Sequence, residues 1–387
     1  MTTILIPRET LPGETRVAAT PDTVRKLVRE GFEVLVESGA GLGASIKDEE
    51  YEAYGARIRN KLAEMYDEAH LVCKLHPPRY NDTLKGHEAD YVRRDGMLIS
   101  FMWPMQNLDT LKILNARKVS VFAMDRIPRI AKAQSMDALS SQTNIAGYRA
   151  VIAAAEKLPK LFPMLMTAAG TIRPAKVVVM GAGVAGLQAL ATAKRLGAVV
   201  EVSDVRPAVK EQVESLGGRY IEVQNDPAMQ DSGGYAKEAS KEFLTRQQAL
   251  VRTHITAADV VITTALVPGK PAPKLVTADM VAEMHPGSVI VDMAVAQGGN
   301  CELSDGEKTF TTGGGVTIIG SSHLAATAPF HASEMYARNV LNVINHLYKY
   351  AELILYFEED ITNAAVIAHA GKIRIQAAAE AVEKGGR

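Results

Sequence analysis

The chain has 387 residues, which is long enough for two domains of ordinary size. Hydrophobic residues make up 47% of it and the formal net charge is −1, so the composition is globular and excludes a general attraction to nucleic acid or anionic membranes. The cysteines, Cys73 and Cys301, form no C-x-x-C pair and are typical of buried thiols in a reducing compartment. We expect no signal peptide, no transmembrane helix and no metal site.

The N-terminal third of the chain alternates short apolar runs with helical patterns. Strands are predicted at residues 3–6, 32–36, 71–75, 97–103 and 119–123. Helices are predicted from Thr20, which precedes a proline, and at residues 48–54 and 108–115. This alternation is typical of an α/β domain with a mostly parallel sheet. No glycine fingerprint accompanies it in this region of the chain.

The next region follows a polar segment at residues 125–141 and a long predicted helix at residues 144–158. Its further predicted elements are strands at 177–180, 199–203, 260–264 and 288–292, helices at 187–196, 207–216, 236–253 and 334–348, and a hairpin at 310–319. We therefore predict an α/β fold of two Rossmann-like domains with mostly parallel sheets, linked by long helices, with a cleft between them. Residues 1–128 with about 350–387 would form the first domain, and residues 129–349 the second.

One stretch of the second predicted domain carries a nucleotide-binding pattern. Gly181, Gly183 and Gly186 form G-x-G-x-x-G between a valine-rich strand and a helix. The first glycine permits a tight turn, the second lets a pyrophosphate approach the backbone, and the third lets the helix pack close to the strand. The free N–H groups of the helix N-terminus favour phosphate. The alternative is a glycine-rich turn in an unliganded domain; a membrane span is excluded because the uncharged run is too short.

Asp204 closes the next predicted strand, 18 residues after Gly186, at about the spacing of the acid that binds an adenosine ribose diol. A carboxylate there repels a 2′-phosphate, so we expect NAD(H) rather than NADP(H), although Arg206 weakens that preference. Further residues expected to contact the dinucleotide are Val184, Ala185, Val205, Arg206, Ala265 and Leu266.

The polar segment at residues 125–141 combines side chains that suit a nicotinamide carboxamide. Arg129, Gln134, Asp137 and Ser140 follow one another at intervals of 5, 3 and 3 residues. A cation, an amide and a carboxylate together offer the donors and acceptors that a carboxamide needs. The alternative is that Asp137 and Ser140 cap helices and Arg129 forms a solvated ion pair, and the spacing does not decide between the two.

Several separate segments resemble one family. They are AMDRIPRIAKAQSMDALSSQTNIAGYRAV, GAGVAGLQALATAKRLGAVV, KEQVESLGG, GGYAKE and ITTALVPGKPAPKLVT. Together they look like the soluble NAD(H)-binding alpha component of the proton-translocating NAD(P) transhydrogenases, within the alanine dehydrogenase/transhydrogenase superfamily. The resemblance runs from Ile4 to about Ile319 and suggests the split form, in which the soluble component is a separate polypeptide.

The resemblance implies direct hydride exchange between NADH and NADP⁺, with NADP(H) bound on a partner domain and proton movement coupled through membrane-spanning subunits. Arg129 and Asp137 would hold the nicotinamide carboxamide, with Ser140 beside them. Gln134 would reach the nicotinamide ribose of the partner domain's nucleotide, and Tyr235 matches a mobile loop that closes over bound nucleotide.

The resemblance also assigns Asp204 to the ribose. It implies a homodimer, located in the cytoplasm and peripheral on the cytoplasmic face of the inner membrane through partner subunits. A hydride that passes between two nicotinamide rings needs positioning and exclusion of water, and it needs no general acid, general base or metal at this site. We expect no nucleic-acid partner.

The alternative within the superfamily is an alanine dehydrogenase. Arg16 and Lys74 match that family's substrate-binding Arg and Lys. However, Trp103 stands where that family has a catalytic His, and Ala296 stands where it has an Asp. Neither Trp nor Ala can shuttle a proton, so Arg16 and Lys74 are interpreted as relics or ion-pair formers. A third interpretation is a nucleotide-binding module without turnover.

Overall fold

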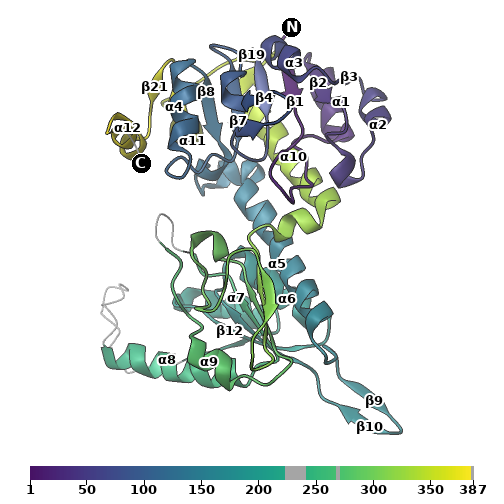
Figure 1. The fold of residues 1–387 in the computed structure, drawn as a ribbon, viewed down its shortest axis with the longest axis vertical. Helices are drawn as coiled ribbons and strands as arrows, with labels where there is room; N and C mark the ends of the chain where they lie inside the picture. The colour runs from purple at the N-terminus through teal and green to yellow at the C-terminus, as the bar shows by residue number, and fades with distance from the viewer. Residues whose placement is uncertain (223–240, 267–270, 385–387) are drawn as a thin grey trace. The chain divides into compact units, whose positions relative to one another are not determined.

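The chain folds into two compact units (Figure 1). The computed structural model describes residues 1–222, 241–266 and 271–384. The first unit contains Met1–Gln142 and the chain from Ala325 onward, and the second contains Thr143–Leu324. Each unit has its own sheet with helices packed on it, so the predicted α/β class with mostly parallel sheets is confirmed.

The boundary between the units differs from the predicted one. Residues 129–142 and 325–349 belong to the first unit, whereas the sequence pattern assigns them to the second domain. The reason is packing, because helix α10 (Pro329–Leu347) buries one face in the core of the first unit. Tyr336 and Ile344 of that helix are fully buried there.

The first unit is built on an eight-stranded sheet. Its strands are β1 (Thr3–Ile6), β2 (Glu33–Glu37), β3 (Arg57–Arg59), β4 (Leu71–Cys73), β7 (Met97–Ser100), β8 (Ser120–Ala123), β20 (Val366–His369) and β21 (Lys372–Ile373). Its other helices are α1 (Pro21–Arg29), α2 (Asp48–Glu52), α3 (Leu62–Glu68), α4 (Leu108–Ala116), α11 (Asp360–Ala365) and α12 (Gln376–Glu383). Short hairpins join β5 (Tyr80–Asn81) to β6 (Gly86–His87) and β18 (Tyr348–Lys349) to β19 (Glu352–Leu353).

The strand order of this sheet is β21-β20-β8-β7-β4-β1-β2-β3. Six neighbouring strands of this sheet are parallel, namely β3, β2, β1, β4, β7 and β8. At the β8 edge, β20 and β21 extend the sheet in antiparallel pairing. Every residue of β1, β7 and β8 is buried, as expected for apolar strands covered on both faces. The carboxyl-terminal residues of the chain therefore complete the sheet of the first unit.

The second unit is built on a seven-stranded sheet. Its strands are β11 (Lys176–Met180), β12 (Val199–Ser203), β13 (Arg219–Tyr220), β14 (Val260–Thr263), β15 (Val289–Asp292), β16 (Thr309–Thr311) and β17 (Thr317–Gly320). Its helices are α6 (Val184–Arg195), α7 (Lys210–Ser215), α8 (Lys241–Thr256) and α9 (Ala278–Glu283). Helix α5 (Ala138–Lys157) leads the chain into this unit, and β9 (Leu165–Thr167) pairs with β10 (Gly170–Ile172) as a separate hairpin.

The sheet of the second unit has the order β13-β12-β11-β14-β15-β17-β16, with only β16 antiparallel. Counted within the unit, the parallel strands follow the order 3-2-1-4-5-6, which is that of dinucleotide-binding folds. The order reverses between β11 and β14, and ligands of such sheets bind at the carboxyl ends of those strands. The predicted hairpin at residues 310–319 is confirmed as β16 and β17.

Three helices begin earlier than the sequence pattern predicts, and one of them is α10, which begins at Pro329 rather than at residue 334. Helix α5 begins at Ala138, because the carboxylate of Asp137 caps its first turn. Helix α6 begins at Val184, directly after the second glycine of the fingerprint. Within the polar segment before α5, residues Ala131–Met136 form a 3₁₀ helix, η4.

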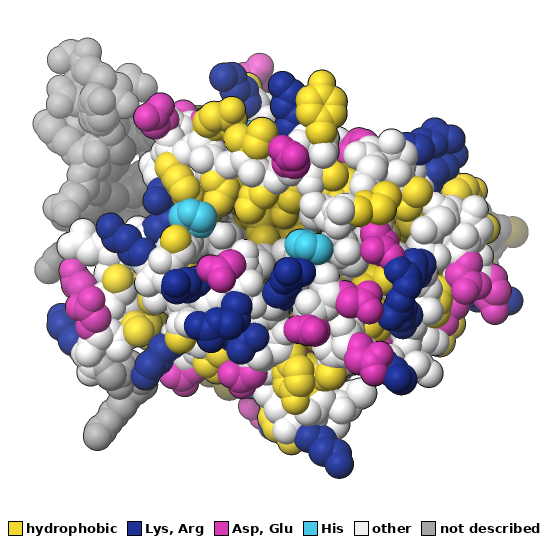
Figure 2. Space-filling view, turned by 90° about the horizontal axis from the view of Figure 1, so that it is seen from above, with side chains coloured by type: hydrophobic (Ala, Val, Ile, Leu, Met, Phe, Trp, Pro, Cys, Tyr) yellow, Lys and Arg dark blue, Asp and Glu magenta, His cyan; other side chains and the backbone are white. Residues whose placement is uncertain are grey.

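One face of the molecule is shown in space-filling form in Figure 2. On that face Lys and Arg side chains are interspersed with Asp and Glu, as a net charge of −1 suggests. Among the described residues, no helix combines the length and the apolar character needed to cross a membrane. The described residues also contain no group of three or more His, Cys, Asp and Glu side chains that could hold a metal ion.

Candidate functional site

The glycine fingerprint forms the turn between β11 and α6. Gly181 has φ 106°, a backbone conformation that residues with a side chain rarely adopt. A Cβ atom at Gly186 would lie 1.8 Å from the carbonyl oxygen of Gly181, so only glycine allows the helix to approach the turn this closely. At Gly183, by contrast, no described atom beyond the two adjacent residues lies within 4 Å of the point that a Cβ would occupy. The turn is therefore tight at its ends and open at Gly183, directly before the N-terminus of α6.

The residues after β14 lie beside this turn. The Thr264 hydroxyl donates to the carbonyl oxygens of Met180, at 3.3 Å, and Gly181, at 3.2 Å, which ties the end of β14 to the fingerprint. Ala265 and Leu266 follow, and the Leu266 side chain is exposed. These two predicted contact residues thus lie at the edge of the sheet where the strand order reverses.

Asp204 follows β12 and faces the same turn. One carboxylate oxygen of Asp204 accepts the Ala182 N–H at 2.7 Å. The Arg206 side chain donates Nε to one oxygen and Nη2 to the other, both at 2.9 Å. Burial raises the pKa of Asp204, but the hydrogen bonds from Arg206 and Ala182 outweigh it and hold the pKa below its ordinary value. A negative charge is therefore fixed beside the fingerprint, and the adjacent Val205 and Arg206 side chains are exposed.

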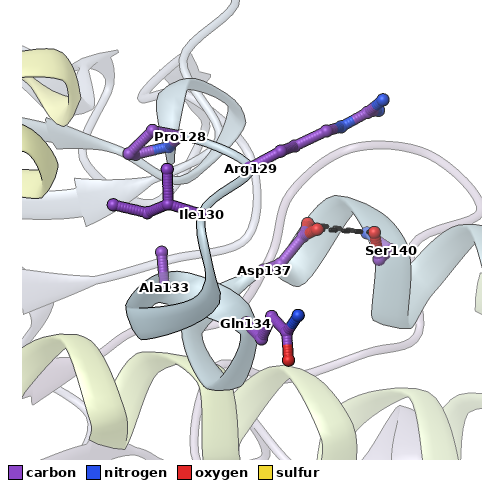
Figure 3. A pocket seen from close by; sticks show the side chains of 7 residues that line it. All are labelled: Pro128, Arg129, Ile130, Ala133, Gln134, Asp137 and Ser140. Atoms are coloured by element: carbon purple, nitrogen blue, oxygen red, sulfur yellow. Dashed lines mark hydrogen bonds between the residues drawn. The ribbon is translucent and has the colours of Figure 1, made fainter.

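The four polar residues predicted on the segment before α5 line one pocket of about 340 Å³ in the first unit (Figure 3). The remaining lining residues are Pro128, Ile130 and Ala133. Arg129 is exposed, and Figure 3 shows it extending away from the other labelled side chains. Gln134 is exposed on η4, and Asp137 and Ser140 are half-buried at the start of α5.

Asp137 caps α5, as the structural alternative predicts. One of its carboxylate oxygens accepts the Ser140 N–H at 2.9 Å, and the other accepts the Ser140 hydroxyl at 2.5 Å. Each carboxylate oxygen has a second lone pair, so the cap fixes the orientation of Asp137 without exhausting its capacity to accept hydrogen bonds. The cap and a ligand contact are therefore compatible at this residue.

Asn300 is a residue of this region that the sequence pattern does not single out. Its fully buried side chain accepts the Ala265 N–H at 3.0 Å and donates to the carbonyl oxygens of Ala265 and Pro273 at 2.9 and 2.8 Å. It therefore fixes the backbone of a predicted nucleotide contact. The sole signal in the sequence is the glycine pair that precedes it. Tyr235, the other predicted contact of the second unit, lies outside the described residues.

Arg16 and Lys74 lie at the carboxyl edge of the first sheet, where both are buried in ion pairs. Arg16 Nη2 lies 2.6 Å from Glu14 Oε2, and Lys74 Nζ lies 3.1 Å from Glu88 Oε2. Burial raises the pKa of Glu14, but Arg16 and His76 outweigh it and hold the pKa well below its ordinary value. The chain's own carboxylates thus neutralise both cations.

Trp103 ends the segment after β7 in a left-handed conformation, with φ 43°. Its backbone N–H donates to Asp125, and its ring stacks on that of Phe101 with centroids 6.0 Å apart. Ala296 lies in a short 3₁₀ turn after β15. Neither residue supplies a group that could transfer a proton.

Comparison with known proteins places these features in a family. The description "Alanine dehydrogenase/PNT, N-terminal domain" matches residues 5–146, and the corresponding C-terminal domain matches residues 150–376. A protein of Rhodospirillum rubrum, named as the first portion of the NAD(P) transhydrogenase alpha subunit, is 46% identical over 375 residues, which are 96% of this chain and 97% of that protein.

A solved transhydrogenase structure from Sinorhizobium meliloti is 43% identical, with a TM-score of 0.86, and the match covers 96% of this chain and 99% of that one. The alanine dehydrogenase of Methanococcus maripaludis is 31% identical over 303 residues, 78% of this chain and 74% of that protein.

Proposed function

The chain belongs to the alanine dehydrogenase/PNT family, and from that premise we propose that it is the NAD(H)-binding component of a proton-translocating transhydrogenase. The chemistry is exchange of a hydride between NADH and NADP⁺, with NADP(H) held on a partner domain. The observation that supports NAD(H) binding most directly is the turn that is open at Gly183, with the Asp204 carboxylate beside it.

The residues present fit the adenosine half of NAD(H). The open corner at Gly183 admits a pyrophosphate to the N–H groups of α6. The Asp204 carboxylate can accept hydrogen bonds from both ribose hydroxyls, and it repels a 2′-phosphate. In this proposal, Val184, Ala185, Val205, Ala265 and Leu266 complete the contacts with the nucleotide.

The pocket before α5 fits the nicotinamide end. We assign Arg129 and Asp137 to the carboxamide, because a guanidinium donates to its oxygen and a carboxylate accepts from its amino group. Ser140 holds Asp137 in orientation through the cap, and Gln134 extends toward the nucleotide on the partner domain. These groups bind, orient and exclude water, and none of them needs to move a proton.

Besides the NADP(H)-binding domain, two further partners belong to the proposal. A homodimer is supported by the β9–β10 hairpin, all of whose strand residues are exposed, with the Met166 side chain 66% accessible. A two-stranded hairpin is marginal by itself, and exposed apolar patches of this kind are typical of interfaces. The membrane-spanning subunits of a transhydrogenase would hold the chain on the cytoplasmic face of the inner membrane.

Reconstitution tests the proposal. The chain is mixed with NADPH, an acetylpyridine analogue of NAD⁺ and an NADP(H)-binding domain from a transhydrogenase, and reduction of the analogue is followed by absorbance. We expect reduction in the full mixture and none from the chain alone. Reduction of NAD⁺ by L-alanine with the chain alone would instead establish the alanine dehydrogenase alternative. Binding of NADH without turnover in any mixture would leave a nucleotide-binding module.

A further inference from the structure

Two asparagine side chains of α10 converge on one backbone carbonyl of the segment that lines the pocket. The Nδ2 atoms of Asn339 and Asn342 each lie 2.9 Å from the carbonyl oxygen of Ser135. The two asparagines are three residues apart on one face of the helix, and Asn339 is 6% exposed. Ser135 directly follows Gln134 and precedes Asp137 by two residues. Both amides therefore act on the backbone between the two pocket residues.

The position of this carbonyl explains why it needs outside donors. The 3₁₀ helix η4 ends at Met136, and the last carbonyls of a helix have no partner within it. The Gln134 carbonyl accepts the Asp137 N–H at 3.3 Å, and the Ser135 carbonyl is the next along the chain. A carbonyl oxygen has two lone pairs, so it can accept both asparagine amides at once.

Asn339 also bonds on the far side of Asp137. Its Oδ1 accepts the hydroxyl of Ser141 at 2.7 Å, in the first turn of α5. The side chain thus connects the end of η4 to the beginning of α5 across the residue that joins them. This joint carries the cap between Asp137 and Ser140, so α10 fixes both the backbone that carries Gln134 and the direction of the Asp137 carboxylate.

We propose that Asn339 and Asn342 are positioning residues for hydride transfer, acting through the Ser135 carbonyl to hold Gln134 and Asp137 in place. This inference rests on the proposed function. Neither asparagine lines the pocket, so their effect passes through the backbone of η4. Hydride transfer requires the reacting atoms to approach to about 3–3.5 Å, and a misplacement of about 1 Å can slow such a reaction by about 100-fold.

The test is the single-turnover rate of hydride transfer in the reconstituted mixture, measured beside the dissociation constant of NADH and the thermal midpoint. The variants are Asn339→Ala, Asn342→Ala and the double variant. We expect each single variant to slow transfer by about tenfold or more, while the NADH dissociation constant changes by less than about threefold. Because both amides act on one carbonyl, the double variant should slow transfer by less than the product of the two fold-changes that the single variants cause.

Two control variants separate positioning from folding. Asn345→Ala removes an exposed asparagine one turn further along α10 and should change nothing. Asn81→Ala removes a buried asparagine of the same unit, which bonds Glu88, Thr83 and Leu84. It should lower the thermal midpoint and leave the transfer rate constant of the folded protein unchanged.

Two results would overturn the inference while the wild-type mixture is active. One is an unchanged transfer rate in Asn339→Ala and Asn342→Ala. The other is a loss of rate that is fully accounted for by an equal loss of NADH affinity or by the fraction of protein that is unfolded. Asn81→Ala shows how large the effect of unfolding alone is. A wild-type mixture without hydride transfer would overturn the proposed function itself, and the positioning role with it.

Discussion

The carboxylate of Asp204 already bonds Arg206, which therefore competes with a bound ribose for it. Arg206 donates to both of its oxygens, although the Arg206 side chain is 58% exposed. Solvent around the exposed Arg206 side chain weakens this ion pair, which favours its replacement by a ribose diol. The same guanidinium is the group that a 2′-phosphate would seek if the carboxylate were absent. We therefore expect Asp204 and Arg206 together to decide which dinucleotide this fold accepts.

Asp204→Ala should weaken NADH binding by about 1–3 kcal/mol, the range for a charged hydrogen-bond acceptor that is removed from its partner. NADPH binding should become tighter, because Arg206 is released to meet the 2′-phosphate and the repelling charge is gone. The measurement is titration calorimetry with each nucleotide.

Arg206→Ala is the matched control for this prediction. It should lower NADH affinity much less than Asp204→Ala does, and in combination with Asp204→Ala it should abolish the gain in NADPH affinity. An NADH dissociation constant that is the same in wild type and Asp204→Ala would remove Asp204 from the nucleotide site.

The β9–β10 hairpin is exposed in the second unit, so packing within that unit does not account for it. Figure 1 shows it standing away from the sheet of the second unit. Besides Met166, the side chains of Met164 and Ile172 are 58% and 47% exposed. Isolated two-stranded hairpins are marginally stable in water, so an apolar hairpin of this kind needs a covering surface. A second copy of the chain is the covering surface that the proposed homodimer supplies.

Met166→Glu combined with Ile172→Glu should shift the protein from dimer to monomer, because burying an unpaired carboxylate in an apolar interface is costly. Sedimentation velocity at micromolar concentration measures the change. Met105→Glu, at an exposed methionine of the first unit, is the control and should sediment like wild type. A wild-type protein that sediments as a monomer, or hairpin variants that remain dimeric, would contradict the proposed interface.

The elements that sequence predicts well here are those set by local rules. The valine-rich strand before Gly181, the turn at Gly181 and the acid at Asp204 all depend on residue type and spacing, and the structure has each of them. The pattern places the start of α5 too late, because the cap at Asp137 lies within a segment of mixed polarity. The 3₁₀ helix η4 has too few residues to show a hydrophobic period.

What the sequence could not show depends on contacts between distant residues. The sequence of α10 does not indicate which unit its apolar face packs against, and tertiary packing assigns it to the first. In the same way, nothing near Ser135 in the sequence points to Asn339, which lies 204 residues away. Asn300 bonds Ala265 across 35 residues, and the glycine pair before it does not indicate that contact. Polar side chains that hold a backbone in place are recognised only when the fold brings them together.

At the scale of the whole molecule, the described residues at the positions that an alanine dehydrogenase uses for catalysis supply no acid or base. Arg16 and Lys74 are neutralised by the chain's own carboxylates, and Trp103 and Ala296 supply no proton-transfer group. The described residues that line the pocket are a guanidinium, an amide, a carboxylate and a hydroxyl with apolar neighbours. Such a site suits a reaction in which the hydride moves between two nicotinamide rings and the protein fixes their approach.

The most direct measurement of this claim follows the transferred hydrogen. NADH that carries deuterium at the transferring position of its nicotinamide ring is mixed with NADP⁺, this chain and an NADP(H)-binding domain in ordinary water. Mass spectrometry then reads the isotope in the NADPH formed. Direct transfer between the rings predicts that essentially every NADPH carries the deuterium. NADPH without deuterium would mean that the hydrogen exchanges with water on its way, and it would contradict a site that only positions the two rings.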